Sequence, residues 1–127
     1  MKDSILYAKR IQEAILPSKD EINDALKQSM VLFRPKDIVS GDFYWFSDKG
    51  DLAIIAAADC TGHGVPGALM SMIGSSLLNE IVNEKGITEP AEILMSLKHG
   101  VINALNKQSA NCANAGAQAP KFALEKE

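Results

Sequence analysis

The stretch that decides the fold runs from residue 40 to residue 67 and reads SGDFYWFSDKGDLAIIAAADCTGHGVPG. It holds two runs rich in strand-forming residues, 42–46 and 52–56, and the turn-forming residues 47–51 lie between them. Strand-forming runs on either side of such a turn predict a β-hairpin. The glycine-rich residues 62–67 that follow the second run predict a loop that opens a long helix.

Two aspartates, Asp42 and Asp59, flank this hairpin. If Lys49 and Gly50 form a two-residue turn, Asp42 faces Ala57, and Asp59 lies two residues further on the same face. Diagonal neighbours of this kind are roughly 7 to 8 Å apart, close enough for their carboxylates to share an ion cluster. Carboxylate oxygens suit hard cations such as Mg²⁺ or Mn²⁺. The pair therefore indicates a metal-assisted hydrolase, although aspartates at strand ends also serve as caps, turn formers or solvated groups.

Outward from the hairpin, the hydrophobic period predicts helices and one more strand. Helical spacing of apolar residues covers 3–16, 20–28 and 68–82. A further helix begins near Thr88 and continues to Leu105. The run 30–33 reads as a strand, because the proline that follows cannot donate to a sheet ladder.

Composition narrows the function classes. A chain of 127 residues with 46% hydrophobic and 23% charged residues fits one ordinary domain. Its net charge of -3 and pI near 5.4 argue against a nucleic-acid partner. We expect no membrane span, because no apolar run approaches roughly 18 to 20 residues, and no secretory signal. Cys60 and Cys112 lack zinc-ligand spacing, and a cytoplasmic location fits a chain without a disulfide framework.

Three segments carry a resemblance to a known family. DSILYAKRIQEAILPS, FRPKDIVSGDFYWF and AADCTGHGVPGALMSMIGSSLLNEIVNEKGITEPAEIL closely resemble the opening of SpoIIE-like phosphatases, the bacterial branch of the PPM-type protein phosphatases. The resemblance covers about residues 3–106 and implies an α+β fold, the PPM-type α-β-β-α sandwich. Here we expect that sandwich truncated to an N-terminal helix, a three-stranded β region with a hairpin, and two helices. The implied activity is hydrolysis of phosphoserine or phosphothreonine with two Mn²⁺ or Mg²⁺ ions.

The resemblance also implies roles for residues around the hairpin. Asp42 matches an acidic metal ligand, Asp59 matches the bridging aspartate, and Cys60 matches a residue whose backbone carbonyl is a ligand in relatives. A thiol nucleophile at Cys60 is an alternative, but a cysteine that ends a strand is usually a small buried hydrophobe.

Substrate contacts are expected from basic and loop residues. Arg34 and, two residues later, Lys36 are candidate partners of the substrate phosphate, or else simply solvated. Gly62, His63 and Gly64 form a loop at a helix start whose N–H groups suit an anion, although the glycines also simply permit the turn. His63 has an unperturbed pKa near 6.5, which suits a general acid, but a plain loop role is the alternative.

The resemblance divides the chain into three regions. Residues 1–28 form a linker helix region, 29–107 the N-terminal part of a SpoIIE-like phosphatase domain, and 108–127 a disordered tail rich in Ala, Asn, Gln and Gly. In relatives the linker couples an upstream sensor module to the phosphatase, and the substrate is a phosphoprotein such as an anti-sigma-factor antagonist. A seam of Ala8, Ile11 and Ile15 on the first helix predicts a homodimer.

This sequence departs from the family pattern after the second aspartate. No aspartate follows Asp59, whereas complete family domains continue with further aspartates that close the metal site. Two readings therefore stay open. One is a metal-dependent phosphatase, and the other is a catalytically inactive truncated fragment or a regulatory interaction module.

Overall fold

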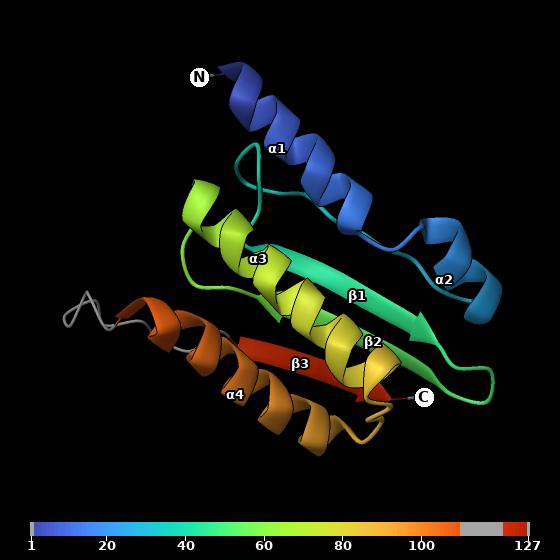
Figure 1. Cartoon of the computed structure of the whole chain (residues 1–127). Coiled ribbons are helices and arrows are strands. Elements are labelled where there is room, and N and C mark those ends of the chain that lie inside the picture. The colour runs from blue at the N-terminus through green and yellow to red at the C-terminus, as the bar shows by residue number, and fades with distance from the viewer. Residues whose placement is uncertain (1, 110–120, 127) are drawn as a thin grey trace.

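A three-stranded antiparallel sheet covered by helices forms the centre of the molecule (Figure 1). The computed structural model describes residues 2–109 and 121–126. Helices α3 and α4 lie together on one face of the sheet, and α1 lies beside α3 (Figure 1). The fold is therefore α+β, as expected. The elements in chain order are α1 (Lys2–Ile15), α2 (Lys19–Ala25), β1 (Asp42–Asp48), β2 (Ala53–Asp59), α3 (Gly64–Leu78), the π-helix η1 (Asn79–Glu84), α4 (Pro90–Ser109) and β3 (Lys121–Lys126).

The hairpin forms where expected, but its turn lies one residue later. The Lys49 N–H donates to the Leu52 carbonyl at 2.8 Å, so Gly50 and Asp51 are the two central turn residues. Gly50 has φ of 85°. Two-residue hairpin turns need a positive φ at the first central position, which glycine adopts at little cost and lysine does not.

The core lies between the sheet and the helices. Alternate residues of β1 and β2 point to the helical side, as the two-residue period of a strand requires. The Trp45 indole N–H donates to Asn79 Oδ1 at 2.9 Å, which satisfies its polar atom in this packed region. The core members are Phe43, Trp45, Ile54, Ala56, Ala58, Cys60, Leu78, Ile81, Val82, Ile93 and Leu97.

One long apolar helix bears on the expectation that no segment of the chain spans a membrane. The continuous helix Gly64–Glu84 consists of α3 followed by η1. By length and composition alone it could cross a membrane. In this fold its residues Leu78, Ile81 and Val82 are buried in the core. Packing against the sheet accounts for its hydropathy, as in the core helices of many globular domains.

The expectation of a strand at residues 30–33 is wrong. The segment forms no ladder with the strands of the described ranges. Val31 and Phe33 are half-buried whereas Met30 and Leu32 are exposed, so the side chains do alternate as in a strand. Phe33 packs edge-on against Tyr44 of β1, with ring centroids 5.6 Å apart. The alternation therefore reflects packing over the sheet and not pairing within it.

The third strand comes instead from the region expected to be a disordered tail. Helix α4 continues to Ser109, and Lys121–Lys126 pairs with β2 as β3. Residues 110–120 lie outside the described residues. Pairing with β3 satisfies the N–H and C=O groups along an edge of β2 that a two-stranded hairpin leaves open.

Candidate metal site

Asp42 and Asp59 stand directly opposite each other, at the end of the hairpin away from its turn. The register pairs Asp42 with Asp59 and Asp48 with Ala53. Directly paired residues of antiparallel strands project to the same face. Their two side chains are also within hydrogen-bonding reach of each other. The expected common face is present, while the expected diagonal offset is wrong because the turn lies one residue later.

The electrostatics of this pair suit a cation. Burial raises the pKa of the Asp42 carboxyl, and the hydrogen bond and negative charge of Asp59 raise it further. Two adjacent carboxylates disfavour double ionisation, and a divalent cation between them would relieve that repulsion. Their oxygen donors are those that Mg²⁺ and Mn²⁺ prefer. Within 2–109 and 121–126, no group of three or more His, Cys, Asp or Glu gathers that could hold a metal. The pair thus fits part of a metal site.

Close backbone packing holds the start of β1 against the loop after β2. A Cβ on Gly41 would lie 2.9 Å from the Gly62 carbonyl oxygen, and a Cβ on Gly67 would meet the same oxygen at 2.9 Å. The Cys60 N–H donates to the Gly41 carbonyl at 3.3 Å, which extends the pairing one step beyond Asp42 and Asp59. Glycines at these positions let the two segments approach closely.

The Cys60 side chain belongs to the core and not to the site surface. It is 3% exposed. Burial, and then the charges of Asp42 and Asp59, raise the pKa of this thiol to about 11. A thiol with this pKa stays protonated at neutral pH, which disfavours the nucleophile alternative. The backbone carbonyl of Cys60 remains a predicted ligand.

A cleft of about 700 Å³ opens beside the aspartates, on the sheet face opposite α3 and α4. Arg34 lines it together with Asp42, Asp59 and Tyr44. One predicted phosphate-binding residue therefore lines the same cleft as the two aspartates. Apolar residues that include Ile22, Leu26, Val31, Phe33 and Ile55 form most of the remaining wall.

The predicted glycine loop does not line this cleft. His63 has an 88% exposed side chain, and its Nδ1 lies 3.6 Å from Asp37 Oδ2. Gly62 and Gly64 have φ of 93° and 65°, a region that favours glycine. These values favour the turn-forming role for the two glycines. His63 precedes α3 at its N-cap position without a side-chain capping bond.

The sequence analysis did not single out Gln12 and Ser40, two residues whose hydrogen bonds lie next to the site. Both are buried, and they are joined by hydrogen bonds between α1 and the segment before β1. One signal in the sequence pointed to Gln12. It lies four residues after Ala8 and four before Leu16, on a helix face that is otherwise apolar.

The raised pKa of Asp42 predicts a specific pH dependence. Because the folded chain holds this proton more tightly than the unfolded chain, the group stabilises the fold fully below its unfolded pKa. That contribution is lost as the pH rises through the folded pKa. In EDTA, Asp42→Asn should therefore gain stability relative to the wild type as the pH rises above the ordinary aspartate pKa of about 3.9. Urea unfolding of both proteins at several pH values measures the difference, and a constant difference would contradict the expectation.

Comparison with known proteins connects this site to a family. No protein-family model matches the chain. The chain is 33% identical over 102 residues to the phosphoserine phosphatase RsbU of Bacillus subtilis (strain 168), which covers 80% of this chain and 29% of RsbU. The solved SiaA-PP2C domain of Pseudomonas aeruginosa matches with a TM-score of 0.80 and 34% identity, over 97% of this chain and 47% of that one.

Agreement in sequence and in fold defines a PP2C-type phosphatase domain, of which the described elements form a part. In sequence and in fold the chain corresponds to part of a SpoIIE-like (PPM-type) phosphatase domain. It spans less than a third of the curated relative and about half of the solved domain.

Proposed function

We propose that this chain carries part of the site of a metal-dependent phosphoserine/phosphothreonine protein phosphatase. The observation that supports the proposal is the direct cross-strand pairing of Asp42 with Asp59. In the proposed site the two carboxylates and the Cys60 carbonyl hold Mn²⁺ or Mg²⁺. A bound ion of this kind lowers the pKa of a water molecule and polarises a phosphoryl oxygen.

The remaining roles follow from position. Arg34 orients the substrate phosphate, because it lines the same cleft as the aspartates and a guanidinium pairs well with phosphate oxygens. Gly62, His63 and Gly64 are proposed to contribute through the shape of the loop that begins α3. A general-acid role of His63 has less support, because its side chain is exposed and pairs with Asp37.

The substrate and the cellular setting are proposals by analogy with RsbU, which is named as a phosphoserine phosphatase. We propose a phosphoprotein substrate of the anti-sigma-factor antagonist type, an upstream sensor module that acts through α1, and a cytoplasmic location. The alternative, a catalytically inactive fragment or regulatory interaction module, is favoured by one observation. The described residues offer two clustered carboxylates and no third acidic group beside them.

Hydrolysis assays separate these two functions. The chain alone, with excess Mn²⁺, should show little or no hydrolysis of p-nitrophenyl phosphate or of a phosphoserine protein, because a site with few ligands holds its ion and water loosely. A version continued with the distal half of a SpoIIE-like relative should hydrolyse both substrates. An extended version that folds, binds Mn²⁺ and still has no activity would support the non-catalytic alternative.

A dimer through α1 is a second proposal, with its surface revised by the structure. Ala8 is half-buried on the face that turns to α3, so it does not belong to the exposed seam. Tyr7, Ile11 and Ile15 recur every four residues and are 65%, 39% and 40% exposed. Such a stripe on one helix suits a partner helix.

Sedimentation tests this dimer. The wild type should sediment as a dimer, and Ile11→Glu should shift it to a monomer without loss of helical content, because a charge in an apolar seam is poorly solvated when buried. Glu13→Gln, an exposed neighbour on α1, serves as the control. A monomeric wild type at the highest soluble concentration would contradict the proposal.

A further inference from the structure

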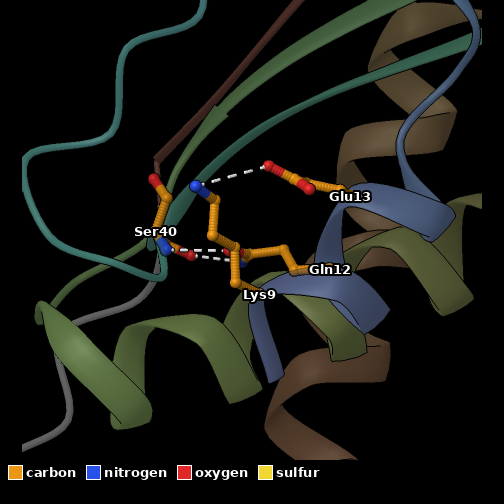
Figure 2. A network of polar contacts seen from close by, with 4 residues as sticks. All are labelled: Lys9, Gln12, Glu13 and Ser40. Carbon is orange, nitrogen blue, oxygen red and sulfur yellow. Dashed lines mark hydrogen bonds and ion pairs between the residues drawn. The ribbon is translucent and has the colours of Figure 1, made fainter. Parts of the chain in front are cut away.

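The side chain of Gln12 is joined to the backbone of Ser40 by two hydrogen bonds. Gln12 Oε1 accepts from the Ser40 N–H at 2.8 Å, and Gln12 Nε2 donates to the Ser40 carbonyl at 2.6 Å (Figure 2). The same Nε2 donates to Ser71 Oγ of α3 at 2.9 Å. One amide thus serves both backbone groups of a residue 28 positions away, as a neighbouring strand would.

This contact is buried, so water molecules cannot easily replace its hydrogen bonds. Gln12, Ser40 and Ser71 are 7%, 7% and 3% exposed. Without the Gln12 amide, the N–H and C=O of Ser40 would lose partners in a place that solvent hardly reaches. Neighbouring Lys9 and Glu13 pair with each other on the exposed side of α1 at 3.8 Å and are separate from this contact (Figure 2).

Ser40, which Gln12 holds, is in turn hydrogen-bonded to the backbone of Asp42. Its Oγ accepts from the Asp42 N–H at 3.0 Å. Gly41, between them, accepts from the Cys60 N–H. The backbone that carries Asp42 is therefore fixed on one side by the pairing with β2 and on the other by Ser40, which Gln12 holds.

We propose that Gln12 is a positioning residue for the candidate metal site, which holds the Asp42 carboxylate opposite Asp59 through Ser40. The proposal rests on the proposed function in one respect, that Asp42 and Asp59 ligate the cation. Residues that orient metal ligands without touching the metal commonly change its affinity by 10- to 100-fold when replaced. Because Gln12 lies on α1, a displacement of that helix would also move Ser40.

The test uses the whole chain and Gln12→Met, which keeps the length and helix propensity of the side chain but cannot form the bonds to Ser40. Mn²⁺ affinity, measured by electron paramagnetic resonance, should weaken at least about tenfold. In the metal-free chain, hydrogen exchange of the Ser40 and Asp42 amides should accelerate about tenfold while the amides of β2 keep their rates.

Three further variants sharpen the test. Glu13→Gln, next to Gln12 on the same helix, should leave both readouts unchanged. Ser71→Ala removes the bond to α3 but keeps those to Ser40, so it should lower thermal stability with Mn²⁺ affinity nearly unchanged. Gln12→Asn keeps a donor and an acceptor on a side chain one methylene shorter, so it should give an intermediate result, and it replaces Gln12→Met if that variant does not fold.

The outcomes separate this proposal from the proposed function. A folded Gln12→Met with wild-type Mn²⁺ affinity and wild-type exchange at Ser40 and Asp42 would overturn the positioning role. Equal acceleration of hydrogen exchange at every amide, with unchanged Mn²⁺ affinity, would also overturn the positioning role. Gln12 would then stabilise the fold without positioning Asp42. If the wild type binds no Mn²⁺ at the two aspartates, the proposed function fails, and the exchange rates of the metal-free chain decide the positioning role alone.

Discussion

Asp59→Asn is expected to reduce Mn²⁺-dependent phosphatase activity by at least about 100-fold in a version of the chain extended with the distal half of a SpoIIE-like relative. Asparagine keeps the size of the side chain but removes the charge opposite Asp42. An ion held by fewer charges binds more weakly and fixes the attacking water less well. Steady-state hydrolysis of p-nitrophenyl phosphate across a range of Mn²⁺ concentrations measures the loss.

Asp48→Asn is the matched control for this substitution. Asp48 is an exposed aspartate on β1 at the turn end of the same hairpin, away from the Asp42 and Asp59 pair. The control should retain activity within about twofold, because asparagine keeps the side-chain oxygen that accepts the Gly50 N–H in the turn and the position lies away from the two aspartates. Equal losses in the two variants would show that the charge of the hairpin, and not a site at Asp59, supports catalysis.

The second large effect is expected in the core. Leu97 on α4 is 0% exposed and belongs to the cluster that joins the helices to the sheet. Leu97→Ala should lower the free energy of unfolding by about 2–5 kcal/mol, because it removes buried apolar surface and leaves a cavity. Denaturant unfolding measures the change. Met95→Ala, on the same helix at a residue 58% exposed, should cost much less, and equal costs would contradict this account of the core.

The parts of the fold that local patterns specify could be predicted from the sequence. The hairpin follows from two strand-forming runs around turn residues, and the helices follow from apolar spacing. A turn centred on Lys49 and Gly50 would need a positive φ at lysine, whereas in the structure Gly50 takes that position and the turn lies one residue later. A shift of the turn by one residue moves the pairing by two, so Asp42 and Asp59 kept a common face even though their expected offset was wrong.

The parts that depend on contacts between distant segments could not be predicted. Whether Met30–Phe33 or Lys121–Lys126 joins the sheet depends on which edge is open and what covers it, and neither is visible in a local window. The hydrogen bonds of Gln12 to Ser40 are of the same kind, since they join residues 28 positions apart. Arg34 precedes the first aspartate motif in the sequence, but that it lines the same cleft as the aspartates depends on the folded arrangement, which no local pattern gives.

Paramagnetic broadening by Mn²⁺ tests the central claim most directly, that Asp42 and Asp59 together form one divalent-cation site. Substoichiometric Mn²⁺ added to the isotopically labelled chain should broaden the amide signals of Asp42, Asp59 and their immediate neighbours first. Asp42→Asn and Asp59→Asn should each remove this selective effect. Broadening that centres on the glutamates of the helices, or that persists unchanged in both variants, would contradict the account.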